Sequence, residues 1–255
     1  MLLSKPETNF KISKNLKLNY NTFSLNFAHS NISGFNVCPL ANKINENENN
    51  PKKSNCSSVC VGGNGFASIH NSVIESRIKK TLSYFLDKKE FLLQLSFEVD
   101  KAVKLSIKKD LKPSFRLNAY SDIRWEKDII KDGKNIFQLF PDVDFYDYTK
   151  IPNRKVPKNY QLTYSHHNPD FLGTIQALKR GFNVAMVFEK LPKFIKIDGV
   201  KYGVLDGDKS DLRLNESYNG KNCIIGLKFK GSKKKLQEAV IDGFCISKNN
   251  ESLIN

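Results

Sequence analysis

The chain of 255 residues lacks several features that would place it in a familiar class. It has no uninterrupted apolar run near the roughly 20 residues that a membrane-spanning helix needs, so we expect no membrane partner. Met1 to Phe10 contains a proline and a glutamate and no continuous apolar segment, which argues against a secretory signal. Five cysteines is an odd number and disfavours a closed disulfide framework. We therefore expect a cytoplasmic protein with reduced thiols.

Nucleotide, calcium and nickase motifs are also missing. The stretch 62–65 (Gly-Gly-Asn-Gly) lacks the Lys-Ser/Thr that completes a phosphate-binding loop. The aspartates between 206 and 211 do not have the spacing of a calcium-binding EF-hand loop. The adjacent pair His166-His167 would point to opposite faces of a strand, which disfavours a shared metal ion in a rolling-circle nickase.

Positive charge and aromatic residues are plentiful. The net charge is +15, from 41 Lys and Arg against 26 Asp and Glu, and such an excess favours contact with a nucleic acid. Lysine is abundant together with asparagine and isoleucine, a set that AT-rich codons encode, so genome composition is a competing explanation of the charge. Apolar residues make up 40% of the chain and include 18 Phe, which is enough for a folded core.

Hydrophobic periodicity predicts alternating strands and helices. A period of two indicates a strand or hairpin over 15–27, and a period of three to four indicates helices from about 70 and over 88–109. Further strands are expected at 114–120, 143–148, 160–165, 183–188, 203–206, 223–229 and 243–246, and further helices at 128–140 and 171–179.

This alternation favours an α/β fold with a mainly parallel sheet, organised as an incomplete (β/α) barrel. With no internal repeat and no clear linker, we expect one domain over 1–255. The segment 31–65 is expected to be an inserted loop that carries the cysteines, with 42–55 as a mobile insertion.

Three cysteines of this loop are candidate metal ligands. Cys38, Cys56 and Cys60 fall within 23 residues of an Asn- and Gly-rich stretch that follows the first predicted strand. Thiolates favour zinc, copper(I) or iron–sulfur clusters, and His70 is the nearest candidate for a fourth zinc ligand. Ordinary free thiols are the alternative. Cys223 and Cys245 lie in apolar strand runs and are expected in the core.

Polar residues follow several predicted strands and define a candidate pocket. Ligands of parallel α/β sheets bind at the carboxyl ends of strands, although polar turn residues are common there as well. The candidates for catalytic side chains are Asn118, Asp122, Lys150, Ser165 and Asp206. Asp208 and Asp211 could bind a cofactor through a hard cation, a ribose or an amine; a solvated turn is the alternative.

A basic stretch near the carboxyl end is the candidate for nucleic-acid binding. Its members are Lys228, Lys230, Lys233, Lys234 and Lys235, which could grip phosphates. A basic surface turn is the competing interpretation.

Several of these motifs occur in the same order in a phage-encoded family. Cys38-Pro39, Cys56-Ser-Ser-Val-Cys60, the segments 116–123 and 140–150, and Leu205-Asp-Gly-Asp208 resemble the gene product 88 family over about 23–246. The resemblance implies a viral or mobile-element origin and a location in the host cytoplasm. It implies no particular reaction.

A more distant resemblance is to radical SAM enzymes, whose partial barrel carries a cysteine loop after the first strand. Those enzymes usually have Cys-x3-Cys-x2-Cys, whereas here Val-Gly-Gly follows Cys60 and the third thiol, Cys38, lies upstream. The resemblance implies an enzyme with an iron–sulfur cluster or zinc, an unknown small-molecule substrate and S-adenosylmethionine as a cofactor. Two alternatives stay open: a nucleic-acid-binding protein with a structural zinc, and a host-interaction protein on an inactive barrel.

Overall fold

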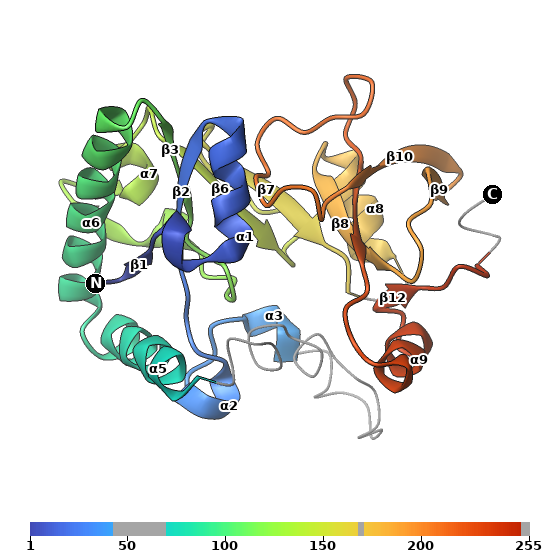
Figure 1. Cartoon of the computed structure of the whole chain (residues 1–255), viewed down its shortest axis with the longest axis horizontal. Coiled ribbons are helices and arrows are strands. Elements are labelled where there is room, and N and C mark those ends of the chain that lie inside the picture. The colour runs from blue at the N-terminus through green and yellow to red at the C-terminus, as the bar shows by residue number, and fades with distance from the viewer. Residues whose placement is uncertain (43–69, 168–170, 251–255) are drawn as a thin grey trace.

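A large, mostly parallel sheet organises the protein (Figure 1). The computed structural model describes residues 1–42, 70–167 and 171–250. The strands lie in the order β1 (Leu3–Ser4), β2 (Tyr20–Leu25), β3 (Lys112–Arg116), β6 (Asp144–Thr149), β7 (Tyr160–Ser165), β8 (Asn183–Phe188), β11 (Ile224–Lys228), β10 (Val200–Asp206) and β9 (Phe194–Ile197). Neighbours from β2 to β10 pair in parallel, and β1 and β9 add antiparallel edges. The α/β class and the mainly parallel sheet are confirmed; the sheet is not closed.

Five strands lie side by side in the order in which the chain makes them, from β2 through β3, β6 and β7 to β8. The order then reverses, because β11 lies between β8 and β10. A short last strand, β12 (Cys245–Ile246), pairs with the end of β8 at Val187 and Phe188. β7 pairs with β8 only up to Ala185. Beyond that residue, β12 is the neighbour of β8 on the same side.

Helices cover one face of the sheet. α5 (Asn71–Leu86) and α6 (Lys88–Lys108) connect β2 to β3, and α8 (Leu172–Lys179) connects β7 to β8. Phe91, Leu95 and Val99 of α6 are fully buried in one core cluster with Phe23 and Phe115 of the sheet. Their spacing of three to four residues forms the apolar stripe that a helix packed on one side requires.

The opposite face is covered by short helices near the amino end and by one long connection. η1 (Pro6–Thr8), α1 (Phe10–Ser13) and η2 (Lys14–Leu18) stand in front of the sheet (Figure 1). The stretch 207–223 returns from the end of β10 to the start of β11 and contacts β6, β7 and the start of β8 on its way. Two chain segments from opposite ends of the sequence therefore share this face.

Two predicted elements are wrong. The helix predicted over 128–140 is a hairpin of β4 (Ile129–Lys131) and β5 (Lys134–Asn135) followed by α7 (Ile136–Leu139). Asp132 and Gly133 both have positive φ, the backbone of the tight turn that Asp-Gly favours between strands. The strand predicted from residue 15 begins only at Tyr20, because residues 14–18 form η2 and Asn19 ends it in the left-handed conformation.

Other predicted elements are confirmed with small shifts in their limits: α5, α6, α8, β3, β6, β7, β8, β10, β11 and β12. The structure adds β1, β9 and α9 (Lys233–Ile241) to them, and the expected loop contains the short α2 (Ser30–Ser33) and α3 (Pro39–Asn42). Of the predicted insertion, residues 43–55 lie outside the described part of the chain. In the described ranges no helix is long and apolar enough to cross a membrane.

Candidate functional site

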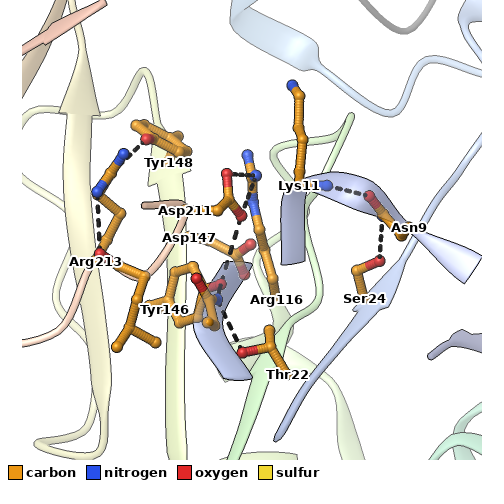
Figure 2. A network of polar contacts seen from close by, with 12 residues as sticks. Asn9, Lys11, Thr22, Ser24, Arg116, Tyr146, Asp147, Tyr148, Asp211 and Arg213 are labelled. Atoms are coloured by element: carbon orange, nitrogen blue, oxygen red, sulfur yellow. Dashed lines mark hydrogen bonds and ion pairs between the residues drawn. The ribbon is translucent and has the colours of Figure 1, made fainter. Parts of the chain in front are cut away.

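The face opposite the helices carries a network of polar side chains. Side chains alternate between the two faces of a strand, so Phe115 and Phe145 enter the helix-side core while Arg116, Tyr146 and Tyr148 point the other way. Figure 2 shows these three residues converging on Asp211 and Arg213, which the stretch 207–223 supplies. The network is therefore built where β3 and β6 meet a segment that lies 95 positions after Arg116 and 65 positions after Tyr146.

Asn15 joins the first segment of the chain to this network. Its Nδ2 donates to Thr22 Oγ1 at 2.9 Å and to the Tyr146 hydroxyl at 3.0 Å. Thr22 Oγ1 lies 2.7 Å from Ser114 Oγ on the neighbouring strand. Because all four side chains are buried, their hydrogen bonds fix η2 against β2, β3 and β6.

Arg116 and Asp211 form the charged centre of the network. Nη1 of Arg116 donates to both carboxylate oxygens of Asp211, at 2.9 and 2.8 Å. The guanidinium also lies 4.9 Å from the ring centre of Tyr148. Burial opposes the charge of Arg116, but Asp211 more than offsets it and raises the Arg116 pKa, so the guanidinium stays charged. Burial also raises the pKa of the Tyr146 hydroxyl.

Arg213 holds the stretch 207–223 against the sheet. Its Nε donates to the Tyr148 hydroxyl at 2.6 Å, and its Nη2 donates to the carbonyl oxygens of Gly207 and Ser210. Its Nη1 pairs with Glu216 at 2.8 Å. Every nitrogen of this buried guanidinium is bonded inside the protein, which makes it a structural clamp.

Cations gather at the rim of the network. Lys230, after β11, pairs with Asp208 at 2.6 Å, and Lys14 donates to the Asp208 carbonyl oxygen at 2.9 Å. Partial desolvation, followed by the charge of nearby Arg116, lowers the pKa of Lys11. Lys11, Lys14, Arg116 and Lys230 are four cations near two carboxylates, Asp208 and Asp211, so the rim is net positive.

A small recess opens beside Arg116 at the carboxyl ends of β2 and β3. It has room for about one water molecule, about 10 Å³ measured to the centre of a water-sized sphere. Its walls are Asn9, Lys11, Ile12, Ser24, Arg116, Ala119 and Tyr120. Two of these residues are cationic and none is acidic.

Two of the predicted catalytic residues have structural contacts. The Asn118 side chain accepts hydrogen bonds from Ser121, Ile123 and Trp125, and donates to Ile123 and Tyr160. Asp122 pairs with Arg154 at 2.9 Å and accepts from the Lys150 backbone nitrogen. These contacts hold the loop after β3 in place, and catalytic roles for Asn118 and Asp122 stay predictions.

The other three predicted catalytic residues lie at strand ends but do not form one cluster. Lys150 and Ser165 meet at the ends of β6 and β7, where Nζ donates to Oγ at 3.4 Å. Asp206 ends β10, and its carboxylate accepts from the Asp208 backbone nitrogen at 3.0 Å. Catalytic roles for these residues stay predictions.

The predicted cofactor residues Asp208 and Asp211 face different cations. Asp208 pairs with Lys230 and Asp211 with Arg116. In the described part of the chain, no three His, Cys, Asp or Glu side chains form a group that could hold a metal ion.

Only one of the predicted thiolate ligands can be placed. Cys38 is half-buried beside the loop after β3, where its thiol lies 3.7 Å from the Tyr120 carbonyl oxygen. Cys56 and Cys60 lie outside the described residues. Cys223 and Cys245 are buried in the core, as the sequence predicts, and burial raises their pKa values to about 11 and about 12.

The predicted nucleic-acid-binding lysines divide into two groups. Lys228 is the last residue of β11 and donates its backbone nitrogen to the Asp208 carboxylate, and Lys230 follows two residues later. Lys233, Lys234 and Lys235 form the exposed first turn of α9, which Ser232 caps. Lys233, Lys234 and Lys235 therefore lie in a helix and not in the basic surface turn that was the competing interpretation.

Two further titratable groups are deeply buried. Asp147 accepts from the Asn118 backbone nitrogen at 2.8 Å and from the Tyr160 hydroxyl at 3.0 Å, and burial raises its pKa to about 7. His166 lies 2.8 Å from Thr174 through Nδ1, and burial lowers its pKa to about 3. Neither lines the recess.

Arg116 and Lys11 were missed as candidate site residues. A signal for Arg116 is present, because it alternates with Phe115 and Leu117 at the end of a strand whose other face is apolar. Lys11 carries no such signal, because its neighbour Arg116 is 105 positions further along the chain.

The comparisons with known proteins give a family and no function. No curated protein and no solved structure matches the chain significantly. The family model described as Gene product 88 matches residues 1–248. With nearly the whole chain covered, the protein belongs to the Gene product 88 family of phage proteins.

Proposed function

We propose that this phage protein is a metal- or iron–sulfur-binding enzyme whose active site lies at the carboxyl edge of the parallel strands. The observation that carries the proposal is the position of Cys38. Its segment follows β2, the first parallel strand, and its thiol lies beside Tyr120, directly after β3. Ligands of parallel α/β sheets bind at this edge.

The strand order supports a radical SAM-like architecture. β2, β3, β6, β7 and β8 are adjacent in chain order, as in an incomplete (β/α) barrel. The face that would line such a barrel carries Arg116, Tyr146 and Tyr148. A polar inner face is what a site for a polar substrate requires.

The thiols have the chemistry of a soft-metal site. Cys38 is half-buried and lies at the correct edge, so its position fits a ligand; Cys56 and Cys60 are the further candidates. An iron–sulfur cluster with an open iron would supply one-electron chemistry toward a bound cofactor such as S-adenosylmethionine. The cationic rim of Lys11, Arg116 and Lys230 would attract a negatively charged substrate.

Elemental analysis of protein purified without oxygen tests the proposal. We expect about four iron atoms per chain for a cubane cluster, or about one zinc for a tetrahedral site. The variants Cys38→Ser, Cys56→Ser and Cys60→Ser should each lose metal, whereas Cys245→Ala, at a thiol buried in the core, should retain it. Metal-free wild-type protein after reconstitution with iron, sulfide and zinc rejects the proposal.

A second candidate function is nucleic-acid binding with a structural zinc. The observation that favours it is the triple lysine at the start of α9, at Lys233, Lys234 and Lys235. Cations at a helix amino terminus are unfavourable because they lie at the positive end of the helix dipole. A bound anion, such as a nucleic-acid phosphate, would offset this cost for the three exposed lysines.

Salt dependence separates this function from a merely basic surface. Binding to DNA or RNA should weaken steeply with salt, and replacing Lys233, Lys234 and Lys235 by glutamine should lower the slope of log K against log salt by about 2–3. The matched control replaces Lys101, Lys104 and Lys108 on the exposed side of α6. An equal effect of both triple variants, or no binding at low salt, removes this candidate.

A host-interaction protein on an inactive barrel is the third candidate. In its favour, α1, η2 and the stretch 207–223 cover the polar face, and the recess beside Arg116 holds only about one water. It predicts a metal-free protein that captures a specific host protein without any nucleic acid.

A further inference from the structure

We propose that the recess beside Arg116 binds the oxyanion group, phosphate or carboxylate, of a small molecule. The site is at the carboxyl edge used in the proposed function and shares Lys11 and Arg116 with it, but it uses none of the cysteines and needs no metal. The inference deepens that function by naming a chemical class for its ligand.

The first argument is the free edge of the Arg116 guanidinium. Asp211 occupies Nη1 with both of its oxygens. Nε is buried and has no hydrogen-bond partner, and no bond from Nη2 is found among the described residues. Nε and Nη2 form the side-on fork that binds carboxylate or phosphate through two parallel hydrogen bonds.

The second argument is the composition of the recess. Asn9, Lys11 and Ser24 line the recess together with Arg116, and no acidic residue lines its walls. Figure 2 shows Arg116 between Asp211 on one side and Lys11, which also lines the recess, on the other. A buried donor without a partner costs free energy, and an oxyanion in the recess would satisfy it.

The third argument is the local charge balance. Asp211 neutralises only one of the two cations that line the recess, and Lys11 has no ion pair within the described ranges. Since the recess has room for about one water molecule, one oxygen of the oxyanion would enter it, while the rest of the ligand would extend toward the open rim where Lys14 and Lys230 lie.

The neighbouring bonds hold the recess in shape. Asn9 donates to Ser24 Oγ at 3.3 Å and accepts from the Lys11 backbone nitrogen at 3.1 Å, which positions α1 beside β2. Arg116 itself is 92% buried, since 8% of it is exposed. The guanidinium, held by Asp211, is therefore preorganised before a ligand arrives, which favours affinity.

Calorimetric titration of the full chain with inorganic phosphate and with succinate tests the proposal and separates the two sources of oxyanion. We expect saturable binding of at least one probe. Lys11→Ala should weaken it about tenfold, as should Arg116→Lys, which keeps the charge but loses the fork. Lys17→Ala, an equal charge change in the same amino-terminal segment, should bind as the wild type does.

Three results would overturn the inference: no saturable binding of either probe, an equal loss in Lys17→Ala and Lys11→Ala, or full affinity in Arg116→Lys. If Arg116→Lys fails to fold by circular dichroism, Ser24→Ala replaces it, with the same expected direction of change. Phosphate or succinate binding by metal-free protein would support this inference while the metal proposal fails, and metal without anion binding would do the reverse.

Discussion

Arg154 and Asp122 form an ion pair of 2.9 Å in which only 2% and 7% of the two side chains are exposed. The pair ties the loop after β3 to the loop after β6 at the carboxyl edge of the sheet. Arg154 also pairs with Glu126 at 2.7 Å and donates to the Ile123 carbonyl oxygen. The pair is therefore the centre of a buried charge network.

Removing the cation of this network should cost much stability. We expect Arg154→Met to lower the free energy of unfolding by about 3–5 kcal/mol, because it leaves two buried carboxylates without their partner. Lys179→Ala breaks the exposed pair with Asp198 and should cost less than about 1 kcal/mol. Urea denaturation measures the free energy of unfolding of both variants. Similar decreases in the two variants would mean that the Arg154 ion pairs stabilise the protein no more than an exposed pair does.

Asp147 should make stability depend on pH. Its pKa is raised by burial to about 7, above the ordinary value of 3.8. Between these values the native state binds the proton more tightly than the unfolded chain, so this group's contribution to stability falls as pH rises from 4 to 7. Asp147→Asn should remove this contribution, which is on the order of 4 kcal/mol at most.

Denaturation curves of wild type and Asp147→Asn at several pH values measure the difference. The variant should gain stability relative to wild type as pH rises toward 7, with no further gain above it. Asp198→Asn, on the surface, serves as the control. Parallel pH profiles for wild type and Asp147→Asn would contradict the prediction.

His166 should behave in the opposite sense. Burial, and then the nearby charges of His167 and Lys150, lower its pKa to about 3 from 6.5. The unfolded chain takes up a proton below 6.5 that the native state refuses, so this group's stability contribution is lost as pH falls from 6.5 toward 3. NMR signals of the ring should stay constant from pH 8 to 4, and titrate near 6.5 in urea. Titration of the His166 ring near pH 6.5 in the native protein would contradict this prediction.

Arg213 should control whether the stretch 207–223 stays on the sheet. Arg213→Ala removes bonds to Tyr148, Gly207, Ser210 and Glu216. Loss of a charged member from a buried network of this kind lowers the free energy of unfolding by about 3–5 kcal/mol. We expect faster hydrogen exchange and proteolysis within 207–223. Lys221→Ala, exposed in the same stretch, should leave both unchanged.

Local pattern predicts much of the framework of this fold. β7 and β8 were predicted at their observed limits because each is a compact β-rich run bounded by turn residues. The helical prediction over 128–140 failed because the turn chemistry of Asp132-Gly133 outweighed the apolar spacing. β9 was missed because its pairing with β10 depends on a turn through Asp198 and Gly199.

The polar network was harder to predict because its partners are far apart in the chain. Lys14 meets Asp208 across 194 positions, and Asn15 meets Tyr146 across 131. Spacing patterns cover a few turns of a helix or one strand. They identified the strand ends correctly and selected Asn118 and Asp122, whose contacts hold the loop after β3, but they did not bring Lys11 to Arg116.

The pairing of β12 with β8, beyond the point where β7 ends its own pairing with β8, has a consequence for shortened chains. Among the described residues, the strand partners of Val187 and Phe188 on that side of β8 are Cys245 and Ile246. A chain ending before Cys245 would present an apolar, unpaired backbone edge, which is a template for intermolecular strand addition. The last short strand thus protects the protein from self-association, and loss of solubility would accompany its removal.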